Sequence, residues 1–151
     1  MKHSSCVYLI KDDQWLMLYR NKKDNDINFG KYIGVGGKLK ENETIEECAI
    51  REVKEETGLT VNSLKKMGDV LFLYPDNEEM ITVYTSSDYK GTLIECDEGT
   101  LQFVKQDRIL ELDLWEGDKI FLNKMMKNES FHLALQYDKY GDLLAVTERN
   151  L

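Results

Sequence analysis

The sequence predicts an α+β fold in which a mixed β-sheet lies between helices. Short runs rich in β-branched and aromatic residues, each bounded by turn residues, recur along most of the chain. Two segments instead carry apolar residues at helical spacing, one amid the early strands and one near the C-terminus. A chain of 151 residues has the size of one domain, so residues 1–151 are expected to form a single unit.

The first part of the chain predicts a β-hairpin and then a loop. The runs SCVYLIKD and WLMLYRN flank the turn residues Asp12-Asp13-Gln14, as expected for two antiparallel strands. NKKDNDINFGKY is polar and rich in turn residues, which predicts a surface loop. The short, glycine-dense IGVGG follows it and is interpreted as a loop that contacts a ligand.

The second part predicts three further strands, a helix and a closing hairpin. SLKKMGDVLFLY and EEMITVYTSSD are strand-like runs on either side of a turn that contains Pro75, and LQFVK is a shorter strand. WEGDKIFLNKMMKN has the spacing of a helix. FHLALQYD and KYGDLLAVTER then predict a hairpin that turns at Gly141-Asp142.

Composition excludes several classes of protein. The formal net charge is −8, and no run of lysine or arginine is long enough to bind a long nucleic acid. The N-terminal apolar run is too short for a signal peptide or a membrane span, so we expect a cytoplasmic protein without a membrane partner. Cys6, Cys48 and Cys96 form no CxxC pair, which argues against a disulfide framework or a structural zinc site.

The segment 37–59 predicts a helix with its own start and stop signals. Thr44 and Glu47 have the spacing of a capping box, and Gly58 suits the left-handed position after a last turn. Ile45, Ala49 and Val53 fall on one stripe, with Ile50 beside it, and this stripe is expected to face the core.

A second stripe of the same helix carries Glu52, Glu55 and Glu56. Like charges three or four residues apart on a helix repel, so this cluster requires a counter-charge. A hard divalent cation such as Mg²⁺ suits it, because Mg²⁺ takes carboxylate and phosphate oxygens as ligands. The alternative is a solvated acidic face relieved by Arg51 and Lys54, and charge pattern alone does not decide between the two.

The spacing of this segment follows a known motif. Residues 37–59 read G-x5-E-x7-R-E-U-x-E-E-x-G-U, where U is aliphatic, and this pattern resembles the Nudix box at every fixed position. A chance match to so many constrained positions is rare. The resemblance implies a Nudix hydrolase domain over residues 1–151, which cleaves a nucleoside diphosphate linked to another group with Mg²⁺, or Mn²⁺ as a substitute.

The resemblance also implies roles for the acidic residues. Glu52, Glu55 and Glu56 are implied metal ligands, and Glu52 and Glu55 are implied catalytic residues, with Glu52 a candidate base. Glu43 and Arg51 are expected to pair with one another or with these carboxylates.

A fourth carboxylate in this family often comes from a loop outside the box. In ECDEGTLQFV the candidates are Glu95, Asp97 and Glu98, and Glu98 fits best as a further catalytic residue and metal ligand. Its alternative is an acidic turn residue beside Gly99.

Residues outside the box indicate the substrate. KYIGVGGKL and WEGDKIF look like the corresponding stretches of MutT-type enzymes, which hydrolyse oxidised purine nucleoside triphosphates. Trp115 is then an aromatic face for the base and Asp118 a hydrogen-bonding group, against the alternatives of a core tryptophan and a residue at a helix start. The other substrate-binding candidates are Arg20, Gly36, Gly37 and Lys38, although the two basic residues also suit an ordinary surface.

One position departs from the pattern. Ile33 stands where the mammalian oxidised-purine triphosphatase has an asparagine that contacts the base, and isoleucine cannot hydrogen-bond a purine edge.

The leading hypothesis is a Mg²⁺-dependent 8-oxo-dGTP diphosphatase that releases a nucleoside monophosphate and pyrophosphate. The alternatives are hydrolysis of ADP-ribose, a dinucleoside polyphosphate or an RNA 5′ end, and a non-catalytic nucleotide-binding module. The expected partner is a small nucleotide, and the resemblance is compatible with a homodimer.

Overall fold

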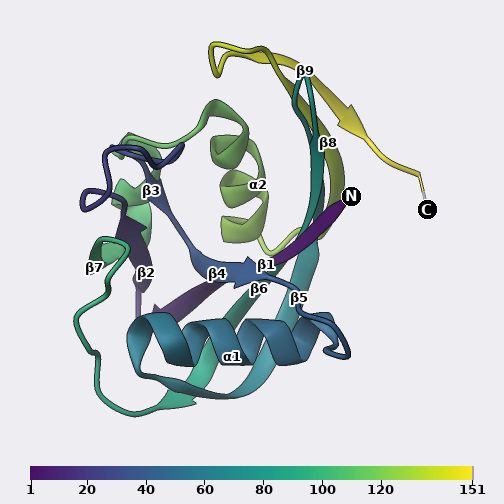
Figure 1. The fold of residues 1–151 in the computed structure, drawn as a ribbon. Coiled ribbons are helices and arrows are strands. Elements are labelled where there is room, and N and C mark those ends of the chain that lie inside the picture. The colour runs from purple at the N-terminus through teal and green to yellow at the C-terminus, as the bar shows by residue number, and fades with distance from the viewer. Residues whose placement is uncertain (151) are drawn as a thin grey trace.

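The computed structural model describes residues 1–150 and contains a mixed sheet with one α-helix on each side (Figure 1). The strands among these residues are β1 (Lys2–Lys11), β2 (Gln14–Tyr19), β3 (Tyr32–Ile33), β4 (Val35–Lys38), β5 (Thr60–Leu73), β6 (Glu78–Lys90), β7 (Thr100–Lys105), β8 (Phe131–Tyr137) and β9 (Leu143–Glu148). The α-helices are α1 (Ile45–Thr57) and α2 (Glu116–Met126), and a 3₁₀ helix, η1, covers Gln106–Glu111. The predicted α+β class is confirmed.

The strands follow the order β3-β2-β1-β6-β5-β8-β9, with β4 paired to β1 and β7 paired to β2. The pairs β1–β6 and β5–β8 are parallel, and the remaining pairs are antiparallel. The predicted hairpins at both ends of the chain are therefore present, and the sheet is mixed, as expected.

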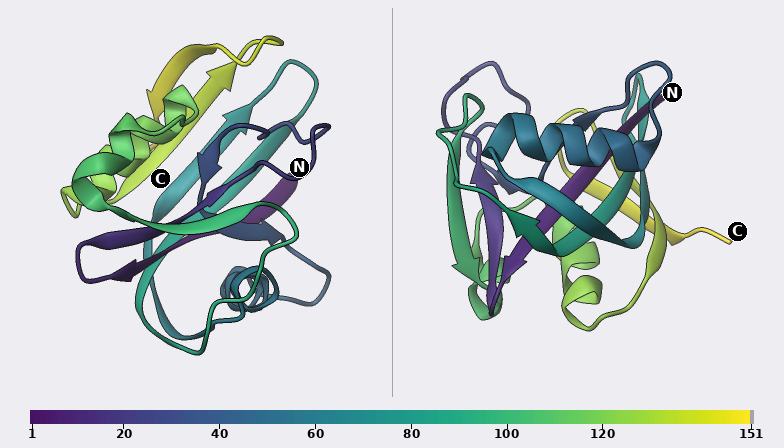
Figure 2. Two further views of the ribbon diagram at one scale, coloured as in Figure 1. Left: turned by 90° about the vertical axis from the view of Figure 1, so that its left-hand side faces the viewer. Right: turned by 90° about the horizontal axis from the view of Figure 1, so that it is seen from below.

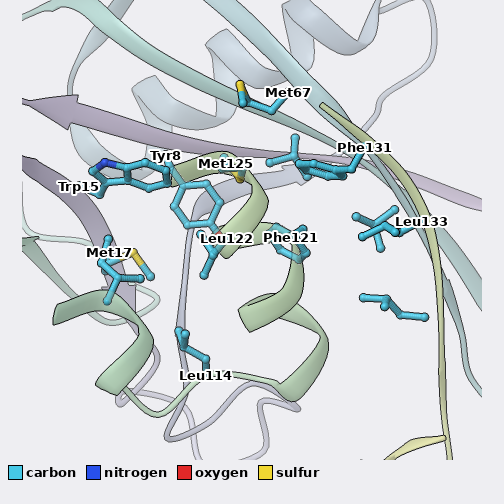
Figure 3. Close-up of a cluster of buried hydrophobic side chains, with 14 of the residues drawn as sticks. Tyr8, Trp15, Met17, Met67, Leu114, Phe121, Leu122, Met125, Phe131 and Leu133 are labelled. Carbon is cyan, nitrogen blue, oxygen red and sulfur yellow. The ribbon is translucent and has the colours of Figure 1, made fainter. Parts of the chain in front are cut away.

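Alternation along β1 sends side chains to two separate cores. Tyr8 packs into the cluster on the α2 side, whereas Val7 and Leu9 pack into the cluster on the α1 side. The two helices lie on opposite sides of the sheet, with α1 viewed along its axis in the left panel of Figure 2. Figure 3 shows the α2-side cluster, where Phe121 of α2 stacks near Phe131 of β8 with ring centroids 5.7 Å apart.

One expectation was wrong, and one element was missed. The segment IGVGG is not a loop, because most of it lies in β3 and β4. Glycines suggested a turn there, but β4 is held by backbone pairing to β1, with Gly36 opposite Cys6 and Gly37 opposite Ser5. The helix η1 was also not anticipated, because one short 3₁₀ turn gives little periodic signal.

None of the helices within residues 1–150 is both long and apolar enough to cross a membrane.

Candidate active site

Helix α1 begins and ends where its capping residues predict. The Thr44 hydroxyl accepts a hydrogen bond from the Glu47 backbone N–H at 3.1 Å, and the Glu47 carboxylate accepts one from the Thr44 N–H at 2.8 Å. Gly58 ends the helix with φ +81°, in the left-handed region that favours glycine. These caps fix where along the sheet the glutamates of α1 lie.

The buried face of α1 differs in one residue from the predicted stripe. Ala49 and Val53 are fully buried and Ile45 is half-buried, as expected, but Ile50 is 36% exposed. Cys48 takes its place in the interior and is fully buried. A buried thiol is the ordinary interpretation of a free cysteine, but the predicted stripe did not include Cys48.

Glu52 lies directly against strand β4. A Cβ atom at Gly37 would overlap the Glu52 carboxylate, so a larger residue at position 37 would push the Glu52 carboxylate away from the strand. This contact explains why the motif begins with glycine at position 37.

Arg51 neutralises several of the box carboxylates. Its Nε donates to Glu43 Oε2 at 2.6 Å, and its Nη1 donates to Glu52 Oε1 at 2.7 Å and to Glu55 Oε2 at 3.3 Å. Its Nη2 donates to the Lys38 carbonyl at 3.1 Å. The predicted pairing of Glu43 and Arg51 is confirmed, and the hydrogen bond from Arg51 lowers the pKa of Glu43 to about 2.

Glu56 occupies a different environment from its neighbours. Its Oε2 accepts a hydrogen bond from the Gly36 backbone N–H at 2.8 Å. The pKa of Glu56 is raised to about 8, mainly by burial and also by the negative charges of Glu52 and Glu98, whereas the Gly36 N–H and Arg20 act in the opposite direction. Glu56 is therefore a half-buried carboxyl that lacks enough positive charge to stay ionised easily.

Glu98 and Arg20 connect two loops beside Glu56. The Arg20 Nη2 donates to Glu98 Oε2 at 2.9 Å, and the Arg20 Nε donates to Asp26 Oδ2 at 2.6 Å. Lys23 also lies 3.3 Å from Glu98. Arg20 is thus paired with carboxylates in this structure, and Glu98 lies on the segment that leads into β7.

A cavity of about 820 Å³ runs from this acidic region to the start of α2. Arg20, Gly36, Gly37 and Glu56 line one part of it. Trp115 and Asp118, which the sequence predicted to bind the base, line it as well. Ile33, which stands where the mammalian oxidised-purine triphosphatase has an asparagine, is also part of the lining. Segments far apart in the sequence therefore meet around one space, and its size suits a small-molecule ligand.

Asp118 is the buried charge of this cavity. It lies in the first turn of α2 and is 6% exposed. Burial raises the pKa of Asp118 to about 7, and the positive charge of Lys31 limits that rise. Near neutral pH this carboxyl can therefore either accept or donate a hydrogen bond.

Trp115 is both a core residue and a lining residue of the cavity, the two roles that the sequence left open. It packs against the α2-side core and also borders the cavity, and its Nε1 donates to the Asn28 side-chain oxygen at 2.8 Å. Its ring meets Tyr137 edge-on at a centroid distance of 5.9 Å.

Some of the predicted site residues do not line this cavity. Glu52, Glu55 and Glu98 stand beside it and are occupied by Arg51 or Arg20. The Lys38 side chain instead borders a separate hollow of about 710 Å³ near the N-terminus. Within residues 1–150, no three His, Cys, Asp or Glu side chains are already gathered in the geometry of a metal site.

The donor chemistry of these residues nevertheless fits a hard divalent cation. Glu52, Glu55, Glu56 and Glu98 provide only oxygen donors, which Mg²⁺ and Mn²⁺ prefer. Burial raises the pKa of Glu56 most, and the charges of Glu52 and Glu98 add to it, and a bound cation would offset both effects. The residues that could hold a cation are therefore these four glutamates.

Several cavity residues were not identified from the sequence. Cys6 and Tyr8 of β1 line it, and burial raises the pKa of Cys6 to about 12. Tyr137, Tyr140 and Gly141 contribute from the β8–β9 hairpin. The strand alternation placed Cys6 and Tyr8 on one face, but it could not indicate that this face borders a cavity.

Comparison with known proteins agrees with the geometry. The model of the NUDIX domain matches residues 1–125. The chain is 33% identical over 131 residues to an oxidized purine nucleoside triphosphate hydrolase of Danio rerio, covering 85% of this chain and 82% of that protein. It is 31% identical over 147 residues to the protein of the same name from Mus musculus, covering 96% and 93% of the two chains.

The fold is shared with solved MutT structures. The crystal structure of a MutT protein from Bacillus halodurans superposes with a TM-score of 0.88 at 24% identity and covers 97% of each chain. A family match over most of the sequence, together with relatives above 30% identity, establishes the family. The capped acidic helix, with its glutamates arranged around Arg51 and Gly37, is thus a Nudix box, and the chain belongs to the Nudix hydrolase family.

Proposed function

We propose that this chain is a Mg²⁺-dependent nucleoside triphosphate pyrophosphohydrolase that prefers 8-oxo-dGTP and releases a nucleoside monophosphate and pyrophosphate. The observation that carries the proposal is the single cavity of about 820 Å³ that reaches both Glu56 and Asp118. Its acidic part suits phosphates held through a cation, and its aromatic part suits a base. The printed names of the two vertebrate relatives support the same substrate class.

At the acidic end, Glu52, Glu55, Glu56 and Glu98 would hold the cation. A bound Mg²⁺ supplies charge neutralisation on the phosphate oxygens and lowers the pKa of an attacking water. Glu52 accepts from Arg51 through Oε1, which leaves Oε2 for a cation. Glu98, in contrast, pairs with Arg20 through Oε2 and with Lys23 through Oε1 and must exchange one of them. Arg20, once free of Glu98, suits a phosphate contact, and the backbone of Gly36 and Gly37 borders the same space.

At the other end, Trp115 offers a face for a purine and Asp118 a group that hydrogen-bonds the base edge. Ile33 lines the cavity without any hydrogen-bonding group, so discrimination between bases falls mainly to Asp118. A site that hydrogen-bonds a substrate group discriminates more strongly than an apolar pocket does. The preference for an oxidised purine therefore depends on one carboxyl.

The test is a substrate panel with identification of the products. It compares 8-oxo-dGTP, dGTP, dATP, dCTP, ADP-ribose and a dinucleoside polyphosphate in the presence of Mg²⁺. The proposal expects the highest kcat/KM for 8-oxo-dGTP, with monophosphate and pyrophosphate as products. Release of inorganic phosphate from the triphosphates, or a higher kcat/KM for ADP-ribose or the dinucleoside polyphosphate, would overturn it.

A further inference from the structure

The loop between β2 and β3 makes a direct side-chain contact with the tryptophan of the cavity. The Trp115 indole Nε1 donates to Asn28 Oδ1 at 2.8 Å, and both residues line the cavity. The indole nitrogen can only donate, so the amide oxygen of Asn28 is the atom that faces it. The two residues are 87 positions apart in the sequence, so this bond joins the loop to the start of α2.

Asn28 is itself held firmly in the loop. Its backbone N–H donates to Asp26 Oδ1 at 3.1 Å, and its carbonyl accepts from the Lys31 N–H at 2.9 Å. Asp26 uses its other carboxylate oxygen for Arg20, at 2.6 Å from Nε. The acceptor for the indole is therefore fixed by the same carboxylate that orients Arg20 at the acidic end of the cavity.

Lys31 and Tyr137 restrict the indole from two other directions. The Lys31 Nζ lies 5.3 Å from the centroid of the Trp115 ring, and Lys31 does not line the cavity. Tyr137 meets the ring edge-on, with an interplanar angle of 76°. Asn28 thus fixes the indole within its plane, while Lys31 lies over one face of the ring.

We propose that Asn28 is a positioning residue, which holds the Trp115 indole in the orientation that receives the planar base of a purine nucleotide. This inference rests on the proposed function, because it assigns the base to the Trp115 end of the cavity. A side chain without an acceptor at position 28 leaves the indole N–H unpaired and lets the ring turn. Asn28→Asp retains an acceptor of the same shape and should retain the orientation.

The loop offers a matched control. Asn25 is exposed, and its side chain makes no hydrogen bond to any residue within 1–150. Asn25→Ala controls for loss of an amide from this loop, and Asn25→Asp controls for the added negative charge. Asn25 is not among the residues that line the cavity.

The first arm of the experiment observes the two indole N–H signals of ¹⁵N-labelled protein without substrate. The chain has two tryptophans, and Trp15 is 3% exposed in the core, so its signal is an internal reference. Asn28→Ala should shift the Trp115 signal and speed its hydrogen exchange, whereas Asn28→Asp and both Asn25 variants should leave it hydrogen-bonded. An unchanged Trp115 signal in Asn28→Ala would overturn the inference.

The second arm measures kcat and KM for 8-oxo-dGTP and dGTP. Loss of one neutral hydrogen bond that orients the ring should raise KM about three- to tenfold in Asn28→Ala, with kcat changed by less than about twofold. Asn28→Asp should restore KM, and the Asn25 variants should match the wild type. A shifted indole signal with unchanged KM would mean that the bond is only structural, which contradicts the inference.

Failure of the proposed function would be recognised separately. If the wild type hydrolyses no nucleoside triphosphate, the proposed function is wrong, and the inference is then decided by titrating dGMP against the Trp115 signal. Weaker dGMP binding in Asn28→Ala than in the wild type and Asn28→Asp would support the positioning role. Equal binding in all three proteins would overturn it.

Discussion

Glu43 and Glu56 are two carboxyls of the Nudix box in opposite electrostatic surroundings. Arg51 lies within hydrogen-bonding distance of three box carboxylates and keeps the pKa of Glu43 near 2. Glu56 has only the Gly36 N–H as a hydrogen-bond partner among the described residues, and burial holds its pKa near 8. The carboxylate without an arginine is thus the one inside the cavity, where a cation bound together with phosphate has room.

Replacement of Glu56 tests this assignment. Glu56→Gln keeps an acceptor for the Gly36 N–H but removes the charge, so we expect kcat to fall by about a hundredfold or more in a folded protein. Steady-state kinetics measures kcat, and a thermal melt shows whether the variant is folded. Glu46→Gln is the control, since Glu46 is an exposed residue of the first turn of the same helix. Unchanged kcat in Glu56→Gln would remove Glu56 from the catalytic set.

Asp118 gives a prediction for stability against pH. Its pKa is raised from 3.8 to about 7 in the folded protein, so folding favours the protonated form. The contribution of Asp118 to stability is therefore fully present below about pH 4 and is lost as the pH rises to about 7, by on the order of 4 kcal/mol.

Urea unfolding of the wild type and of Asp118→Asn between pH 4.5 and 8 measures this loss. Glu56 also has a raised pKa, but it is present in both proteins, so the difference between them isolates Asp118. The free energy of unfolding of the wild type should fall relative to that of the variant up to about pH 7 and then stay level. A difference that does not depend on pH would show that Asp118 is not buried in this way.

At the scale of elements, the caps of α1 decide where its glutamates lie. The capping box satisfies two backbone N–H groups at the start of the helix, and Gly58 ends it one turn beyond Glu55. These caps act on the fold rather than on the chemistry. Stability and turnover should therefore respond differently when a cap is removed.

Thr44→Ala removes the side-chain acceptor of the capping box. We expect the free energy of unfolding to fall by about 1 kcal/mol, with kcat within about twofold of the wild type under conditions where the protein is folded. Chemical denaturation and steady-state kinetics test the two parts. Thr92→Ala, at an exposed loop threonine, is the control and should change neither. A large loss of kcat without loss of stability would contradict a purely structural role for the cap.

The elements that the sequence predicted correctly are those with local signals. Thr44, Glu47 and Gly58 fix α1 from within the helix itself, and the alternating runs of β5 and β6 are long enough to be recognised. Strand β4 was missed because Gly36 and Gly37 resemble a turn, and their pairing with β1 depends on residues that lie 30 and 32 positions away.

The residues of the candidate site also fall into two groups, those with local sequence signals and those brought together only by the fold. The box glutamates follow from spacing within a single helix, so the sequence could identify them. The ion pair of Arg20 with Glu98 could not be foreseen, because it joins two loops that lie 78 positions apart in the chain. Nor could Tyr137 be recognised, since its hydroxyl reaches the Gly117 N–H only after the β8–β9 hairpin has packed on α2.

At the scale of the whole molecule, the sheet brings the two ends of the proposed nucleotide site together. Helices α1 and α2 lie on opposite sides of the sheet, yet Glu56 and Asp118 line the same cavity (Figures 1 and 2). Strands β1 and β4 lie between them and contribute Cys6, Gly36 and Gly37. The acidic and aromatic ends are therefore separate in sequence and in element, and each can be changed without removing the other.

A bound divalent cation should raise the stability of the folded protein and should be required for hydrolysis. Binding to the folded state alone raises the melting temperature, so Mg²⁺ should stabilise the wild type more than Glu56→Gln. Exhaustive chelation should abolish hydrolysis, and added Mg²⁺ or Mn²⁺ should restore it. Calorimetry and kinetics with and without a chelator test both statements. Full activity after chelation would contradict the metal role of the glutamates.

The most direct test of a two-ended cavity is the ratio of kcat/KM for 8-oxo-dGTP to that for dGTP, measured in the wild type, Asp118→Asn and Glu56→Gln. Asp118→Asn should change the ratio by about 5- to 150-fold, equivalent to roughly 1 to 3 kcal/mol, with little effect on kcat for the preferred nucleotide. Glu56→Gln should lower kcat/KM for both nucleotides and leave their ratio unchanged. An unchanged ratio in folded Asp118→Asn would contradict the account, because the base would then be recognised elsewhere.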